Sequence, residues 1–266
     1  MIEVEILPYT EVEKIAQIFH RDGFALVSDA LTPDQLSYVQ AGASRVMADQ
    51  MQETPLEQAN RGYARYSFGN CMIHPEWILL IDLPTILPIL DGIFGGPDYI
   101  CSSASGDYNG PGAEAQALHR DIQNNIHDPL NQIQLWDMPP PWVVVNYLMC
   151  DITDMNGPIR MIPHTHRIRF PVPSHAEEPN RMKCSTICAP AGTVLIRDVR
   201  TWHGGTDNKS DQIGVMRAMV DVGYFAPWYR IGWVGRSLPM SSYEKLSDRG
   251  KQICRYVVDW QETIDE

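Results

Sequence analysis

The stretch Trp142-Val143-Val144-Val145-Asn146-Tyr147-Leu148-Met149 decides the fold class. Its β-branched and aromatic residues favour an extended strand, and the single amide Asn146 interrupts an otherwise apolar run. Similar short apolar runs lie on both sides of it, at Tyr99–Ser103, Ile159–Ile162, Thr193–Ile196 and Val215–Tyr224. Pro, Gly, Asn and Asp residues separate these runs, and no crossover helices lie between them. The pattern therefore predicts an antiparallel barrel or sandwich.

Helices are predicted on either side of this β region. Thr32-Pro33-Asp34-Gln35 has the Thr N-cap, the early Pro and the Gln of a capping box, and opens a helix to about Gln52. Other expected elements are helices at 11–20, 84–94 and 241–260 and a strand at 24–27. We expect one domain over residues 1–266. Residues 1–96 form a mostly helical support, 97–225 the β core with a lid-like insert at 122–141, and 226–266 a C-terminal helical segment.

Composition and charge limit the function classes. Apolar residues make up 44% of the 266 residues and charged residues 20%, which is typical of a globular protein. A net charge of −12 argues against nucleic acid as a partner, because phosphate binding needs clustered Lys and Arg. The longest apolar run is too short to span a membrane, and neither a secretory signal nor a CxxC pair is present. We expect a cytoplasmic protein with a small-molecule substrate, and the sequence is compatible with a homodimer.

Three residues have the types and spacing of a metal site. His119-Arg120-Asp121 places a His and an Asp two residues apart, on one side of an extended strand, and His203 lies 84 residues downstream before a Gly-rich turn. Two His and one carboxylate on one face of an octahedral ion leave three positions open, as iron oxygenases require. This pattern occurs often by chance, so it needs support from elsewhere in the chain.

Arg217 gives that support. It lies 14 residues after His203 and is the single charge in the apolar run Val215-Met216-Arg217-Ala218-Met219-Val220. A buried arginine is costly unless it has a partner, and its planar guanidinium matches a carboxylate well. The partner is either the distal carboxylate of a bound 2-oxo acid or an internal acid such as Asp198 or Asp221.

Four ordered segments resemble the phytanoyl-CoA dioxygenase-like family of Fe(II)/2-oxoglutarate oxygenases. The segments are Phe19–Leu36, Leu118–Asp121, Asp154–Arg167 and Ala191–His203 followed by Arg217. In the third segment, Asn156-Gly157-Pro158 and Pro163-His164-Thr165-His166-Arg167 are similar to the family's turn and strand. This chain departs from the family at His164, which replaces a glycine, and at Met155 and Ile159.

The resemblance implies a mainly β protein with flanking helices, whose core is a double-stranded β-helix of the jelly-roll or cupin-like type. It implies that His119, Asp121 and His203 hold Fe(II) and are the catalytic centre. Arg217 would bind the distal carboxylate of 2-oxoglutarate, with Gln116, Thr206 and Asn146 as further co-substrate ligands. O2 would be the second co-substrate. Related halogenases have a small residue in place of Asp121, so its carboxylate favours hydroxylation, desaturation, epoxidation or rearrangement.

The substrate is expected to be a small organic molecule, and the likeness to natural-product tailoring members points to a secondary metabolite. Nothing in the sequence resembles a basic groove for a CoA phosphate. Candidate substrate contacts combine polar and apolar side chains: Arg65, Tyr66, Met72, Asn125, Trp136, Tyr224 and Trp228.

Two other functions remain open from the sequence. One is a cupin-like metal-binding protein or non-redox metalloenzyme with zinc or nickel on His119, His203 and His164, which would leave Arg217 unexplained. The other is a barrel-shaped binding protein that has lost its activity. Intact metal-ligand and Arg residues argue against it.

Overall fold

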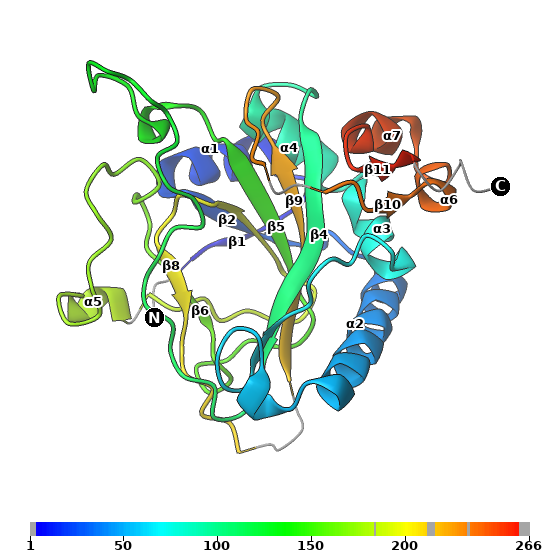
Figure 1. Ribbon diagram of the computed structural model, residues 1–266, viewed down its shortest axis with the longest axis horizontal. Helices are drawn as coiled ribbons and strands as arrows, with labels where there is room; N and C mark the ends of the chain where they lie inside the picture. Colours follow the sequence, from blue (N-terminus) through cyan, green and yellow to red (C-terminus); the bar gives the residue numbers. More distant parts are fainter. Residues whose placement is uncertain (1–3, 184, 212–215, 233–234, 261–266) are drawn as a thin grey trace.

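A large, mainly antiparallel sheet forms the centre of the computed structural model, which describes residues 4–183, 185–211, 216–232 and 235–260 (Figure 1). Neighbouring strands of this sheet pair antiparallel, except that β1 pairs parallel with β2. In spatial order the strands are β1 (Ile6–Pro8), β2 (Phe24–Ser28), β7 (Val194–Asp198), β5 (Trp142–Leu148), β9 (Arg217–Phe225), β4 (Ile100–Asn109) and β3 (Arg65–Ser67).

A smaller layer faces one side of this sheet. Its strands β6 (Ile159–Met161) and β8 (His203–Gly205) pair antiparallel, and single bridges join His119 to His203 and Arg160 to Thr186. A cavity lies between the two layers, since residues from both line it. The two layers form the double-stranded β-helix that the sequence predicts.

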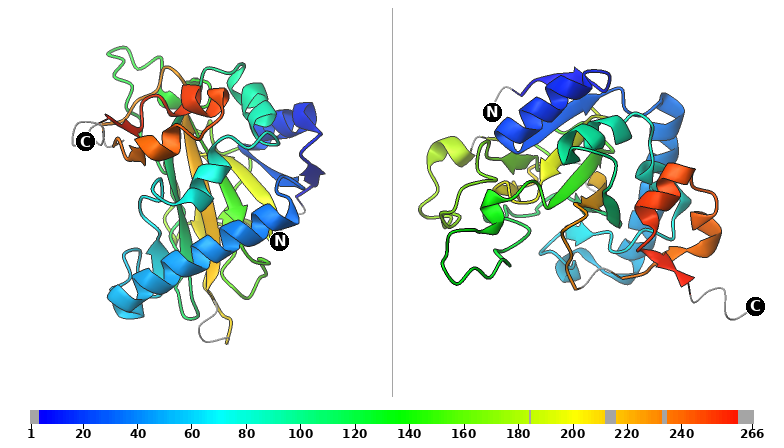
Figure 2. Two further views of the ribbon diagram at one scale, coloured as in Figure 1. Left: turned by 90° about the vertical axis from the view of Figure 1, so that its right-hand side faces the viewer. Right: turned by 90° about the horizontal axis from the view of Figure 1, so that it is seen from above.

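Helices cover the other side of the large sheet, except α5, which lies on the side of the smaller layer (Figure 1 and Figure 2). The helices in chain order are α1 (Val12–Asp22), α2 (Pro33–Glu53), α3 (Pro75–Ile81), α4 (Leu87–Phe94), α5 (Asn180–Lys183), α6 (Met240–Tyr243) and α7 (Asp248–Cys254). The capping box at Thr32 and Gln35 is present and starts α2 as predicted. The helix predicted from residue 84 begins instead at Leu87, which places Pro88 in its first turn, where a missing N–H costs little.

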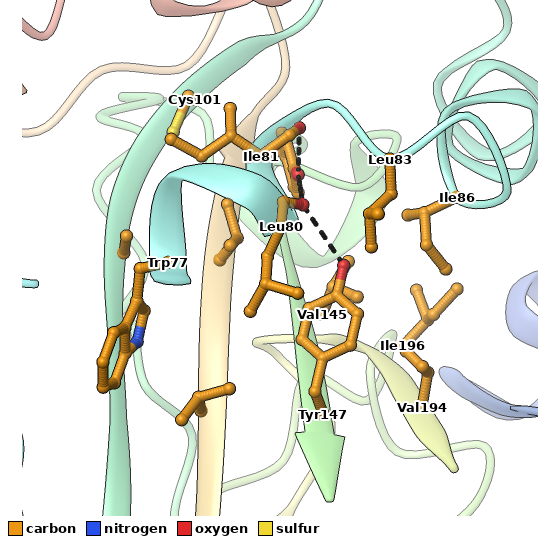
Figure 3. Packing of buried hydrophobic residues seen from close by; sticks show 14 of the residues in the cluster. Trp77, Leu80, Ile81, Leu83, Ile86, Cys101, Val145, Tyr147, Val194 and Ile196 are labelled. Atoms are coloured by element: carbon orange, nitrogen blue, oxygen red, sulfur yellow. Dashed lines mark hydrogen bonds between the residues drawn. The ribbon is translucent and has the colours of Figure 1, made fainter. Parts of the chain in front are cut away.

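Alternation along the strands separates the core from the cavity. In β5, Val143, Val145 and Tyr147 belong to the main core beneath the helices, while Trp142, Val144 and Asn146 line the cavity. Figure 3 shows this core, in which the Tyr147 hydroxyl donates to the Leu80 carbonyl at 3.3 Å.

Several elements differ from the sequence-based expectation. Residues 1–96 contribute three strands to the large sheet as well as helices, and β4 extends to Asn109 because its second half pairs with both β3 and β9. The C-terminal segment contains β10 (Leu238–Pro239) and β11 (Val258–Asp259), which pair with each other where a single helix was expected. The strand expected from Val215 begins at Arg217, and residue 215 lies outside the described residues.

No helix in the described ranges has both the length and the apolar character needed to cross a membrane.

Candidate metal and co-substrate site

His119, Asp121 and His203 lie together between the two layers. One potential ligand atom from each residue lies within 4.8 Å of the others. Asp121 Oδ1 is 3.3 Å from His203 Nε2 and 3.8 Å from His119 Nε2. The exposed fraction of the side chain rises from 6% at His203 to 24% at Asp121 and 41% at His119, so the group is open on one side only.

Both imidazole rings are held in the orientation that a metal ligand requires. His119 Nδ1 lies 2.9 Å from the Ala117 carbonyl, and His203 Nδ1 lies 2.8 Å from the Thr201 carbonyl. A carbonyl only accepts hydrogen bonds, so each Nδ1 carries the proton and each Nε2 keeps a free lone pair directed toward Asp121. This is the outer hydrogen bond that metal-binding histidines usually make. Burial, followed by the neighbouring His203, also lowers the pKa of His119, which favours the neutral ring.

The backbone brings these residues together differently from the prediction. His119 and His203 exchange two backbone hydrogen bonds, at 2.9 and 3.0 Å, and this bridge sets one ring beside the other. Asp121 lies beyond the bridge, outside any strand, and is fixed by its N–H donating to the Val199 carbonyl. The glycines after His203, predicted as a turn, are strand residues of β8. The donor types and their geometry fit a divalent transition-metal ion with three positions open.

Arg197 is a site residue that the sequence analysis missed. Its Nη1 donates to Asp121 Oδ2 at 2.5 Å, and its Nε donates to Asn146 Oδ1 at 3.1 Å. One carboxylate oxygen of Asp121 is therefore engaged by Arg197 while the other faces the two histidines. Burial alone would raise the pKa of Asp121, but Arg197 and His203 hold it well below its usual value.

Hydrogen bonds continue from Arg197 on β7 through Asn146 on β5 to Asp221 on β9. Its Oδ2 accepts from Asn146 Nδ2 at 3.4 Å, and it makes no ion pair with any residue that the structure describes. Burial, followed by the charge of Asp107, raises the pKa of Asp221 to about 7. Asn146 therefore links Arg197 to Asp221, and it also lines the cavity, where it was predicted as a co-substrate ligand.

Arg217 and Arg65 form a pair of neighbouring buried cations, of which Arg65 lines one end of the cavity. Arg217 is 3% exposed and Arg65 is 5% exposed. Arg217 donates through Nη2 to the Gly157 carbonyl, and the Asn109 amide lies against the same guanidinium. Its Nη1 has no hydrogen-bond partner in the described part of the chain. Burial, followed by the charge of Arg65, lowers the pKa of Arg217 to about 10.

The internal salt bridges considered for Arg217 are not formed. Asp198 pairs with Arg200 at 2.7 Å, and Asp221 contacts Asn146. Two adjacent guanidinium groups without a carboxylate are a ready site for an anion. Arg65, predicted as a substrate contact, lines the cavity wall, while Arg217 is not among the lining residues.

Gly205 is the point where Arg65 and Gln116 meet. A Cβ at Gly205 would lie 2.5 Å from Arg65 Nη1 and 3.0 Å from Gln116 Oε1, so a side chain there would displace both. Gln116 Oε1 accepts from the Gly205 N–H at 3.0 Å and lines the cavity. Thr206 lies behind this wall, where its hydroxyl donates to the Pro158 carbonyl and its own carbonyl accepts from Arg65.

The cavity has a volume of about 640 Å³. Serines, carboxylates and arginines supply the polar part of its wall, and side chains such as Val144, Ile159 and Met219 contribute to the apolar part. The triad lies on this wall, so a molecule in the cavity would face the metal ligands.

Most of the other predicted substrate contacts lie away from this cavity. Tyr66 points into the main core, where it stacks on Tyr108 with ring centroids 4.7 Å apart. Met72 and Tyr224 are also core residues, and the Tyr224 hydroxyl donates to the Ile81 carbonyl at 2.7 Å. Trp228 is a surface residue with 42% of its area exposed. These four positions are corrections to the sequence-based expectation, and strand alternation explains Tyr66 and Tyr224.

The insert at 122–141 does not line the cavity. Contacts with Arg120 and Arg200 hold it against the rest of the protein. Trp136 is buried beneath Arg120, whose guanidinium carbon lies 4.0 Å from the ring centroid. Arg200 donates to the Leu135 and Met138 carbonyls. Asn125 is exposed on this insert. Among the described residues the insert has only one short helix, Leu135–Asp137.

Comparisons with known proteins identify the family of the chain. Residues 19–218 match the phytanoyl-CoA dioxygenase (PhyH) family. The dioxygenase FUM3 of Gibberella moniliformis is 29% identical over 178 residues, which cover 63% of this chain and 53% of FUM3. The match thus spans about half the length of that relative.

Solved structures share the fold at low sequence identity. AviO1 from Streptomyces viridochromogenes Tue57 superimposes with a TM-score of 0.63 at 21% identity, covering 84% of this chain and 98% of AviO1. The epimerase SnoN, solved in complex with Fe3+, alpha ketoglutarate and nogalamycin RO, has a TM-score of 0.62 at 16% identity, covering 81% and 84%.

Proposed function

The chain belongs to the phytanoyl-CoA dioxygenase family, and from this premise we propose that it is an Fe(II)- and 2-oxoglutarate-dependent dioxygenase acting on a small organic molecule. The observation that carries the proposal is the arrangement of His119, Asp121 and His203. Two Nε2 lone pairs and one carboxylate oxygen converge, while both Nδ1 atoms are engaged by carbonyls. We propose a secondary metabolite as the substrate, because the sequence resembles natural-product tailoring members and SnoN, which shares the fold, comes from nogalamycin biosynthesis.

The buried arginines support 2-oxoglutarate as the co-substrate. Arg65 and Arg217 would receive its distal carboxylate, since their charges have no carboxylate partner in the described ranges and Arg217 Nη1 has a free donor. Gln116 would border the same molecule, because its side chain lies on the cavity wall beside Arg65. A metal-binding protein without this co-substrate would leave both cations unexplained.

His119, Asp121 and His203 would hold Fe(II). When bound, Fe(II) and 2-oxoglutarate would supply O2-dependent oxidation of a substrate C–H bond, with release of succinate and CO2. The residues around them bind and orient. Arg197 holds one oxygen of Asp121 and leaves the other for the metal, and Arg65 and Arg217 fix the direction of the co-substrate. Because Asp121 is a carboxylate where halogenases have a small residue, we propose hydroxylation, desaturation or rearrangement as the outcome.

The test is anaerobic addition of Fe(II) and 2-oxoglutarate to the purified chain. We expect a weak visible charge-transfer band that His119→Ala abolishes. His127→Ala is the matched control, because His127 is an exposed histidine of the insert, and it should keep the band. A folded wild-type chain without the band, or a band that persists in His119→Ala, would contradict the proposal.

A further inference from the structure

A β-bulge shapes the end of the cavity that lies away from Arg65. The register between β4 and β9 shifts between Cys101 and Ser103. A bulge places an extra residue on one strand and can re-aim its side chain. Here Ser102 and Ser103 are consecutive residues of the cavity wall, and both of their hydroxyls lie close to the Gly223 backbone.

Gly223, on the neighbouring strand, lets three polar atoms converge at this bulge. A Cβ at Gly223 would lie 2.6 Å from Ser102 Oγ, 2.7 Å from Ser103 Oγ and 2.8 Å from Trp142 Nε1. The glycine is therefore required by space, because any side chain would displace the hydroxyls and the indole N–H.

The Ser102 hydroxyl is an independent sign that a ligand binds here. The residue is 5% exposed, yet Ser102 Oγ makes no hydrogen bond with any part of the chain that the structure describes. Burying a hydroxyl without a partner costs about 1–3 kcal/mol. A hydroxyl-bearing ligand in the cavity would remove that cost.

Asp221 extends this polar wall toward the metal ligands. It lies two residues before Gly223 on the same face of β9, and the structure describes no ion pair for it. Asp107 lies on the same cavity wall, on β4. Carboxylates and serine hydroxyls bind neighbouring hydroxyl groups well, whereas an apolar ligand would leave Ser102 Oγ without a partner among the described residues.

The strand register separates this end from the arginine end. Asn109 pairs with both Arg65 and Arg217, and Ser103 pairs with Gly223. Arg217 and Gly223 are six residues apart on β9, which corresponds to roughly 20 Å at about 3.3 Å per residue. A five-carbon dicarboxylate at the arginines would therefore leave the bulge end free.

We propose that Ser102, Ser103 and Asp221 form the substrate subsite for a small molecule with several neighbouring hydroxyl groups, that is, a polyol or a sugar-like compound. This inference rests on the proposed function, because it assigns the other end of the cavity to 2-oxoglutarate.

Binding is tested with myo-inositol, sorbitol and methyl glucoside, each beside its permethylated derivative. Saturation-transfer NMR on the full chain without added metal measures the affinity. At least one parent compound should bind, and its methyl ether should bind at least tenfold more weakly. For the compound that binds, Ser102→Ala with Ser103→Ala should weaken binding about tenfold and Asp221→Asn about fivefold. Ser241→Ala, at an exposed serine on α6, is the control and should leave the affinity unchanged.

Two results would overturn the inference: no parent compound binding better than its methyl ether, or unchanged affinity in the double serine variant with an unaltered melting temperature. Succinate formation with Fe(II), 2-oxoglutarate and O2 separates this inference from the proposed function. If the charge-transfer band forms but only apolar compounds stimulate succinate release, the subsite alone is wrong. If polyols bind but no band forms, the proposed function is wrong and the subsite stands.

Discussion

Removing either buried arginine should weaken binding of 2-oxoglutarate and spare the metal. In Arg65→Met or Arg217→Met, the distal carboxylate loses a charge-assisted hydrogen bond worth about 1.5–3 kcal/mol, which corresponds to about 10- to 100-fold in affinity. Neither arginine forms an ion pair or hydrogen bond with His119, Asp121 or His203 in the described structure, so Fe(II) affinity should change by less than about threefold. Anaerobic titration that follows the charge-transfer band measures both constants.

A second 2-oxo acid tests whether the two arginines bind the distal carboxylate of 2-oxoglutarate. 2-Oxobutanoate keeps the 2-oxo acid group but lacks the distal carboxylate, so it should bind equally to wild type and to both variants. The double variant should lose less than the product of the two single losses, because both arginines serve one carboxylate. Equal weakening of 2-oxoglutarate and 2-oxobutanoate, or loss of Fe(II) binding in either variant, would refute the assignment.

Three further outcomes follow from other contacts. Arg200→Met should destabilise the metal-free chain by about 3–5 kcal/mol in urea unfolding, because it leaves the fully buried Asp198 without its cation. Asp221→Asn should become more stable relative to wild type as the pH rises. The pKa of Asp221 is raised to about 7, so wild type loses stability between about pH 4 and pH 7, and urea midpoints of the metal-free proteins should diverge over that window. Thr32→Ala should cost about 1 kcal/mol in thermal unfolding, because it removes one half of the capping box that starts α2.

The fold was predictable where local chemistry determines it. The Thr32 capping box and the β-branched run at 142–149 are strong signals that tertiary contacts did not override. The segment at 119–121 shows the limit of such reasoning. Spacing brought two ligands to one side, but the structure fixes them through a bridge to His203 and a bond to Val199, contacts between residues far apart in the chain.

Arg197 could have been found by the reasoning that identified Arg217. Each arginine adjoins or lies within an apolar strand run; Arg217 is buried, and only 11% of the Arg197 side chain is exposed. What the sequence does not contain is the partner: Arg197 lies against the Asp121 carboxylate, whereas Arg217 lies beside another cation. The pairing of the strands therefore determines that Arg197 contacts a carboxylate and that Arg217 has no carboxylate partner in the described structure.

The two cavity glycines show why the substrate residues were harder to predict than the metal ligands. Gly205 makes room for Arg65 and Gln116 at one end, and Gly223 makes room for Ser102 and Ser103 at the other. Neither glycine has a positive φ, so neither is required by a turn, and only the packed structure reveals what each one admits. The substrate contacts predicted from the sequence were larger polar and apolar residues, whereas here the absence of a side chain at each glycine makes room for polar groups. Within the described ranges, Arg217 Nη1 at one end and Ser102 Oγ at the other have no hydrogen-bond partner. Burying such atoms is costly unless ligands engage them, and this cost argues that the cavity binds two different molecules at once.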